Sequence, residues 1–283
     1  MNEIIGPQAV TPELKPLVTE LLLGLGDDEF VLGYWDSEWT GVAPMLEEDV
    51  AMSSIAQDEI GHARLFYQQV AALTGTPIDQ LAYGRQPEQY RQVQLVERAR
   101  GDWAFTIARQ FLYDTADQLR IEALKNSAYL PLAQDCAKIE REEVYHQMHV
   151  YAWLERLANS TVEARQHLER ALEELWPDAL GQFEAFPGEE ALLNAGILTI
   201  SSARLQQEWI ATIAPVFARL RLDFPIANID DGAMITGQPA GVPIDETTIV
   251  PRMGGRYGQH TQDFRDLWGQ MTMVYNLEPQ AQW

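Results

Sequence analysis

The sequence predicts an all-α fold: a four-helix bundle with one long crossover and additional C-terminal helices. Apolar residues recur at helical spacing along several long stretches of the 283 residues. No stretch alternates apolar and polar residues between hairpin turns, and no unit of about 20 to 50 residues repeats, which disfavours sheet and solenoid folds. We expect a single domain over 1–283, with the core bundle at about 11–160 and additional helices and a Gly/Pro-rich loop at 161–283.

Two antiparallel helices are predicted in the N-terminal part. The first, over about 11–39, begins at a Thr-Pro dipeptide that is typical of an N-cap and first helical position. Residues 40–44, which include glycine and proline, end it, and a second helical pattern covers about 45–73. The sequence Thr-Gly-Thr-Pro at 74–77 closes this helix.

A second hairpin follows a polar connection at 77–92. Its helices are predicted at about 103–126 and 131–157, with a turn between them at 127–131. The two hairpins share one layout, which is that of a four-helix bundle joined by one long crossover.

The C-terminal part adds further helices. Ser160-Thr161-Val162-Glu163 predicts a capping-box start of a fifth helix, and a long helical pattern covers 192–222. Gly and Pro residues predict a loop over 224–258, and 263–277 is predicted to be a terminal helix.

The charge balance excludes one class of partner. The chain has 42 acidic and 20 basic residues and a formal net charge of -22, so nucleic-acid phosphates would be repelled. The single cysteine, Cys136, cannot form an internal disulfide or a four-cysteine metal site. The apolar run Leu21 to Leu25 is short and flanked by acids, which argues against a signal peptide or membrane span. We expect a cytoplasmic protein.

Two Glu-x-x-His units are the sharpest chemical feature. Glu59 and His62 lie three residues apart in the second predicted helix, and Glu143 and His146 repeat this spacing in the fourth. Residues three apart share one helical face, so each pair can reach the same point in the bundle interior. This arrangement predicts a metal site between the two helices.

A di-iron carboxylate centre also needs one carboxylate from each remaining helix. Glu29 and Asp114 precede Glu59 and Glu143 by nearly equal intervals, so each pair reaches a similar level in its hairpin. Four carboxylates balance two Fe(II) ions, whereas buried without metal each would cost several kcal/mol. Carboxylate and imidazole donors favour iron or manganese over structural zinc, with iron first.

The alternative interpretation is a solvated acidic face without metal. Acidic residues are plentiful, and some stand directly beside the chosen ligands, so a chance match to the motif has to be considered. The acids that compete in this way are Asp28, Asp58, Asp117 and Glu142.

These motifs resemble the phenylacetic acid catabolic family, whose A and C subunits share the ferritin-like fold within the phenylacetyl-CoA epoxidase. The resemblance covers most of the chain. The segments that carry it are Ile55–Ala63 (IAQDEIGHA), Arg141–Gln147 (REEVYHQ), Trp153–Asn159 (WLERLAN) and Glu174–Pro177 (ELWP).

The two types of subunit resemble this chain in different ways. The catalytic A-type has a di-iron ligand set that matches all six residues named above. This chain instead resembles the C-type in its overall length and in three segments of its sequence. Members of the C-type are commonly structural, with their metal ligands replaced. These segments are Asp28–Leu32, Gly255–Thr261 and Leu277–Trp283.

The resemblance implies a role in oxygen-dependent formation of the ring 1,2-epoxide of phenylacetyl-CoA. It also implies electrons from a separate NADPH-dependent reductase, an A-type catalytic partner with other epoxidase components, and a homo- or hetero-oligomer. The charge of -22 suggests that a partner helps to hold coenzyme A. Two alternatives are a metal-free scaffold subunit of the same complex and a ferritin-like protein that oxidises iron or reduces peroxide.

Overall fold

The structure is a computed structural model that describes residues 4–223 and 249–279. Helices make up its regular structure, and the β pairing found in these residues is an isolated bridge between Ile4 and Tyr129. This confirms the predicted all-α fold. None of the described helices is both long enough and apolar enough to span a membrane.

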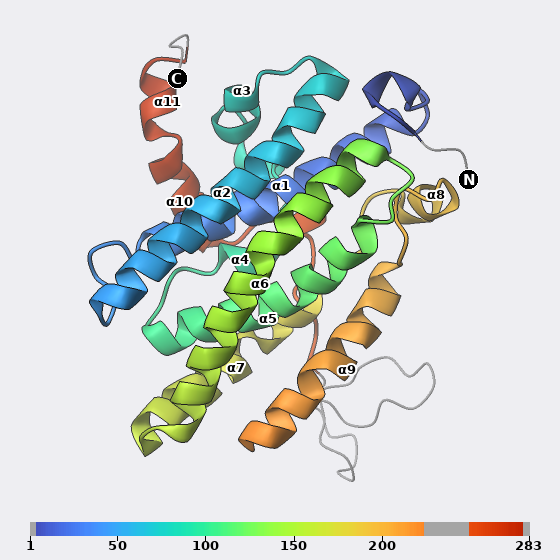
Figure 1. Cartoon of the computed structure of the whole chain (residues 1–283). Coiled ribbons are helices and arrows are strands. Elements are labelled where there is room, and N and C mark those ends of the chain that lie inside the picture. Colours follow the sequence, from blue (N-terminus) through green and yellow to red (C-terminus); the bar gives the residue numbers. More distant parts are fainter. Residues whose placement is uncertain (1–3, 224–248, 280–283) are drawn as a thin grey trace.

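Four long helices form the bundle as two antiparallel hairpins, which lie against each other in Figure 1. The helices are α1 (Lys15–Ser37), α2 (Leu46–Thr74), α5 (Trp103–Leu124) and α6 (Leu130–Asn159). Each of these helices begins and ends within a few residues of the predicted positions. Helix α1 begins at Lys15 because the preceding residues form a turn, in which the Thr11 carbonyl accepts hydrogen bonds from the amides of Leu14 and Lys15.

The crossover and the C-terminal part contribute shorter helices. The crossover contains α3 (Ile78–Tyr83), the 3-10 turn η2 (Pro87–Gln89) and α4 (Gln94–Glu97), where the sequence predicted only a polar connection. The remaining elements are η1 (Pro7–Ala9), α7 (Val162–Gly181), α8 (Glu189–Asn194), α9 (Ser202–Leu220), η3 (Gly255–Tyr257), α10 (Gln262–Met271) and α11 (Met273–Leu277).

The prediction of one long helix over 192–222 is wrong. Gly196 has a φ of 70°, in the left-handed region that favours glycine, and the chain turns there between α8 and α9. Ser201 then starts α9, because its side chain accepts a hydrogen bond from the amide of Arg204. The apolar spacing that suggested one continuous helix comes from two helices, α8 and α9, that pack on the same core.

Two finer predictions also need correction. The capping box at Ser160 is wrong because Thr161 is the N-cap of α7 and accepts from the amide of Ala164, which leaves Glu163 one position short of that role. The predicted terminal helix is divided at Thr272 into α10 and α11. Of the predicted loop, residues 224–248 lie outside the described residues, and the rest contains η3.

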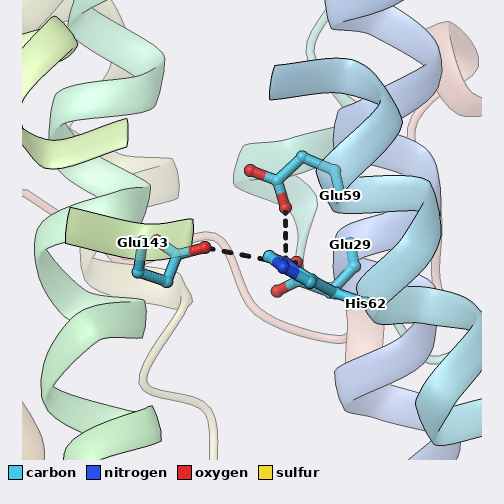
Figure 2. A group of neighbouring side chains, drawn as sticks. All are labelled: Glu29, Glu59, His62 and Glu143. Atoms are coloured by element: carbon cyan, nitrogen blue, oxygen red, sulfur yellow. Dashed lines mark hydrogen bonds and ion pairs between the residues drawn. The ribbon is translucent and has the colours of Figure 1, made fainter. Parts of the chain in front are cut away.

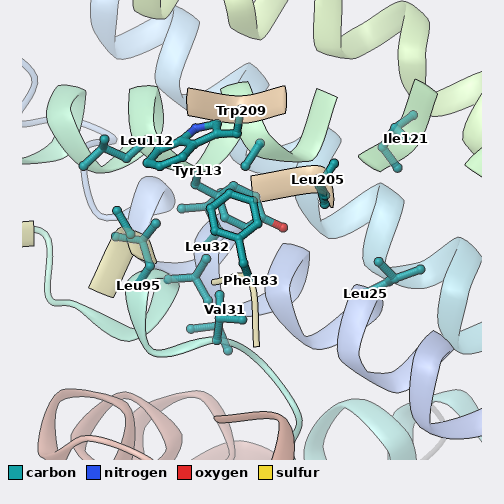
Figure 3. Close-up of a cluster of buried hydrophobic side chains, with 14 of the residues drawn as sticks. Leu25, Val31, Leu32, Leu95, Leu112, Tyr113, Ile121, Phe183, Leu205 and Trp209 are labelled. Carbon is teal, nitrogen blue, oxygen red and sulfur yellow. The ribbon is translucent and has the colours of Figure 1, made fainter. Parts of the chain in front are cut away.

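The core places part of α1 deep inside the molecule. Most residues of α1 from Val18 to Asp36 are buried, including four carboxylates. Figure 3 shows Trp209 of α9 and Phe183, which follows α7, packed in the core with residues of α1 and α5 such as Leu32 and Tyr113. Burial of α1 matters for function because it removes Glu29 from water.

The organisation of residues 1–283 as a single domain stays a prediction.

Candidate metal centre

The two Glu-x-x-His units meet in the interior of the bundle. Glu59 and His62 project from α2, and Glu143 and His146 project from α6, with 2%, 1%, 2% and 1% of their surface exposed. Figure 2 shows Glu143 reaching across from α6 toward His62, with Glu29 of α1 beside them. The spacing of three residues therefore turns both units inward, as the sequence predicted.

Four of the side chains form one compact group. One donor atom from each of Glu29, Glu59, His62 and Glu143 lies within 4.8 Å of the others. The Nδ1 atom of His62 lies 3.2 Å from Glu29 Oε2, 3.7 Å from Glu59 Oε2 and 3.7 Å from Glu143 Oε1. Three carboxylates thus converge on one imidazole nitrogen, a set that suits a divalent cation.

His146 occupies the corresponding position on the other side of the same carboxylates. Its Nδ1 atom lies 3.2 Å from Glu143 Oε1 and 3.3 Å from Glu59 Oε1. Glu59 and Glu143 therefore face both imidazoles, whose ring centres are 6.1 Å apart. Glu59 and Glu143 therefore lie between the two histidines.

Asp114 of α5 lies close to this group but outside the compact set of four. It is 3% exposed, and burial raises the pKa of its carboxyl well above the usual value, with further increases from Glu143 and Glu59. All six predicted residues are buried, and five of them are joined by the distances given above, whereas Asp114 is outside that set.

Two acids beside the Glu ligands hold the histidines from the opposite helix. Asp58 of α2 accepts from Nε2 of His146 at 3.4 Å, and Glu142 of α6 accepts from Nε2 of His62 at 2.7 Å. A carboxylate on Nε2 leaves the lone pair of Nδ1 free for a metal and fixes the ring orientation. The sequence presented these two acids only as competitors, although each directly precedes a ligand in a repeated acid-Glu-x-x-His pattern.

The other buried acids near the centre have a cationic partner. Asp28 pairs with Arg256 at 2.6 Å and Asp117 with Arg120 at 2.6 Å, so neither of these competing acids is free to bind metal. Further buried pairs join Asp27 to Arg85 and Asp36 to Arg109. By contrast, no described Lys or Arg forms an ion pair with Glu29, Glu59, Asp114 or Glu143.

Some donor atoms of the centre lack any hydrogen bond. Glu59 Oε2, Glu143 Oε1 and His146 Nδ1 are buried, and their ion-pair contacts within the centre do not have hydrogen-bond geometry. Such atoms carry a large desolvation cost, which metal coordination removes. The alternative of a solvated acidic face is therefore wrong for these residues, because they are buried. The group of Glu29, Glu59, His62 and Glu143 could hold a metal ion.

Comparison with known proteins adds an independent line of evidence. The family model described as phenylacetic acid catabolic protein matches residues 1–283. The chain belongs to the phenylacetic acid catabolic family. The resemblance that the sequence motifs suggested is thereby confirmed, and the ferritin-like architecture of the helical bundle agrees with it.

Within this family, the chain is similar to both ferritin-like types. It is 32% identical to the C-type chain of the 1,2-phenylacetyl-CoA epoxidase of Escherichia coli (strain K12) over 267 residues, which cover 94% of this chain and 99% of the relative. It is 23% identical to the A-type chain of that epoxidase over 194 residues, or 67% of this chain and 62% of the relative. The overall likeness to the C-type relative agrees with the sequence prediction.

The electrostatics of the metal-free centre differ between its members. Burial raises the pKa of Glu29 well above the usual value, and the charge of Glu59 raises it further. Burial lowers the pKa of His62, but the carboxylates of Glu29 and Glu59 outweigh it and raise the value to about 11. Glu29 also accepts a hydrogen bond from Tyr113 at 3.1 Å. Without metal, the proton on His62 therefore offsets part of the carboxylate charge.

Proposed function

We propose that this chain is a subunit of a multicomponent di-iron monooxygenase that epoxidises the aromatic ring of phenylacetyl-CoA in phenylacetate degradation. The observation that carries the proposal is the group of buried carboxylates with no Lys or Arg partner among the described residues, in a chain of the phenylacetic acid catabolic family. The ligands of the proposed di-iron centre would be Glu29, Glu59, His62, Asp114, Glu143 and His146.

Iron fits the donor set best. Four carboxylates carry a charge of about -4, which two Fe(II) ions balance, and the mixture of carboxylate and imidazole is typical of iron and manganese sites. Bound iron would supply the activation of O2. The protein supplies the ligands, excludes water by burying them, and orients His62 and His146 through Glu142 and Asp58.

The remaining components would come from other chains. Electrons would be delivered by a separate NADPH-dependent reductase, and an A-type partner would join this chain in a cytoplasmic complex. The net charge of -22 makes it unfavourable for this chain alone to hold the phosphates of coenzyme A. We therefore propose that phenylacetyl-CoA is bound with the help of the A-type partner.

Within the complex we favour a stabilising role for the metal of this chain. Its overall likeness to the C-type relative supports this division, because the match covers 99% of that relative but only 62% of the A-type one. A metal that binds only the folded chain stabilises it by mass action. A metal-free scaffold is the second candidate, and the buried donor atoms without hydrogen bonds argue against it. An iron-oxidising or peroxide-reducing protein would need no A-type partner.

The experiment is reconstitution with the A-type partner and the reductase of the same organism. We expect sedimentation to show a tight complex at micromolar concentration and phenylacetyl-CoA epoxidation to require this chain. Glu143→Ala with His146→Ala should leave single-turnover yield largely intact once assembly is confirmed. A loss above about tenfold, roughly 1.4 kcal/mol in barrier, would assign the chemistry to this chain's own centre. A chain that ignores the A-type partner would refute the proposal.

Metal binding should also release protons. His62 has a pKa raised to about 11 and must lose a proton before it binds metal, and the raised pKa values of Glu29 and Asp114 act in the same direction. The apparent affinity for Fe(II) should therefore rise with pH between about 5.5 and 7.5. Anaerobic titration calorimetry in buffers of different ionisation enthalpy measures the release. Identical binding heats in all buffers would contradict this expectation.

A further inference from the structure

The outer surface of α2 and α6 carries no other described helix. Figure 1 shows the two helices side by side across the front of the bundle, and their contacts with each other include the ion pair between Glu48 and His149 at 2.7 Å. We define the α2–α6 face by the exposed residues in the central turns of these helices, from Val50 to Ala72 and from Gln134 to Ala152. They are Val50, Ser54, Gln57, Gly61, Arg64, Gln68 and Ala72 of α2, and Gln134, Lys138, Arg141, Val144, Tyr145, Met148 and Ala152 of α6.

The α2–α6 face contains large apolar side chains in contact with solvent. Val144, Tyr145 and Met148 lie within about one helical turn of α6 and are 51%, 48% and 68% exposed. Val50 of α2 is 64% exposed, and the pair between Glu48 and His149 brings its helical turn near this part of α6. Grouped apolar exposure of this kind is typical of a protein-protein contact.

The charges on the face are the reverse of those on the whole chain. The chain has 42 acidic and 20 basic residues, yet the α2–α6 face has no carboxylate and three cations, Arg64, Lys138 and Arg141. None of these three forms an ion pair with another described residue. The exposed acids of the two helices, Glu47 and Glu155, lie in the turns beyond the face. The acids of the central turns, Asp58 and Glu142 among them, are only partly exposed.

Partly exposed acids of α2 and α6 do not alter this balance, because each already has a partner. Asp58 and Glu142 bind the histidines of the metal centre, Glu140 pairs with Lys125, and Asp135 accepts from Gln69. Lys138 and Arg141 act electrostatically on Asp135 and Glu140, but neither they nor Arg64 forms an ion pair with a described residue, so all three can still meet an external acidic group.

We infer that the α2–α6 face is the docking surface for the A-type partner, through a patch on that partner that combines apolar and acidic side chains. This inference rests on the proposed function. A second copy of this chain fits less well, because two such faces would oppose cation to cation. The face is about 30 Å long and about 20 Å wide, or roughly 600 Å², which approaches the area of about 800 Å² per partner in a stable interface.

Docking here would also cover the metal centre. The side chains of Asp58 and Glu142 are 32% and 42% exposed, whereas the histidines they hold are buried. These two acids are thus the most accessible part of the centre on this side. A partner seated on the face would shield them from water and slow the exit of metal.

The test measures the affinity of the A-type partner of the same organism for surface variants of the iron-loaded chain. Tyr145→Asp with Met148→Asp should raise the Kd at least about 30-fold, and Arg64→Glu with Arg141→Glu at least about tenfold, with weaker salt dependence. The matched control is Val162→Asp with Arg170→Glu on α7, which replaces exposed residues of the same kinds and should bind like wild type. A second readout is the rate at which a chelator removes Fe(II), which the partner should slow.

The outcomes separate this inference from the proposed function. If wild type fails to bind the A-type partner, both are refuted. If wild type and both face variants bind equally well while folding and iron content are unchanged, only the docking surface is wrong. Loss of self-association in the face variants, with partner binding unchanged, would instead assign the face to copies of this chain and overturn the inference.

Discussion

Replacement of Glu59 and His62 together with alanine should reduce bound iron from about two atoms per chain to a negligible amount. Glu59 faces both imidazoles, and His62 Nδ1 is the point on which three carboxylates converge, so the double change removes ligands from both metal positions. The measurement is elemental analysis after anaerobic loading with Fe(II) and removal of excess metal.

The matched control is Glu48→Ala with His149→Ala. These residues form another Glu-His pair between α2 and α6, at 2.7 Å, but belong to no group of metal-binding side chains among the described residues. The control should keep about two iron atoms per chain and should melt near the wild-type temperature. If wild type itself holds negligible metal, the ligand assignment is wrong and the scaffold role becomes the better account.

The substitution Arg256→Met should strongly reduce the stability of the folded chain. The Arg256 side chain is 1% exposed, and its guanidinium donates to both Asp28 oxygens, at 3.0 and 2.6 Å, and to the carbonyls of Gly24 and Arg91. Removal of one member of a buried ion pair leaves the other charge without a partner, which costs about 3–5 kcal/mol. We expect the melting temperature to fall by roughly 10 °C.

Two further variants test the explanation. Arg252→Met removes the half-exposed partner of Asp178, which keeps Arg98 at 2.8 Å, so the expected loss is below about 1 kcal/mol. Addition of Asp28→Asn to Arg256→Met should restore part of the stability, because an amide is cheaper to bury than a charge. Urea unfolding of the iron-loaded proteins gives these differences. Equal losses for Arg256→Met and Arg252→Met would contradict the proposed burial effect.

Arg256 also shows why the C-terminal segment matters to the centre. Asp28 directly precedes Glu29 on α1. The ion pair between Arg256 and Asp28 therefore holds the C-terminal segment against the helical turn that contains Glu29, a proposed ligand. The C-terminal segment can approach the backbone at Gln92 closely because residue 255 is glycine. A Cβ at Gly255 would lie 2.2 Å from the carbonyl oxygen of Gln92. The C-terminal segment thus supports a site whose ligands all precede it by more than a hundred residues.

The sequence by itself determined the helical bundle and predicted the residues of the candidate site. Helical periodicity predicted α1, α2, α5 and α6, because an amphipathic pattern repeats within a few residues. The interval of three placed Glu59 with His62 and Glu143 with His146 on inward faces. Matching intervals within the hairpins then selected Glu29 and Asp114. These are local properties, and helix geometry alone relates them to position in space.

Only the tertiary structure decided which acids belong to the centre. Asp28 and Glu29 are neighbours in a run of acids, and the structure separates their roles because Arg256, 228 residues away, pairs with Asp28. Likewise Glu142 binds His62 across the bundle, 80 residues away. A charge is neutralised by whatever lies near it in space, and packing of distant segments sets that neighbourhood. Packing therefore left these buried carboxylates without an arginine partner among the described residues, which makes them the candidate metal site.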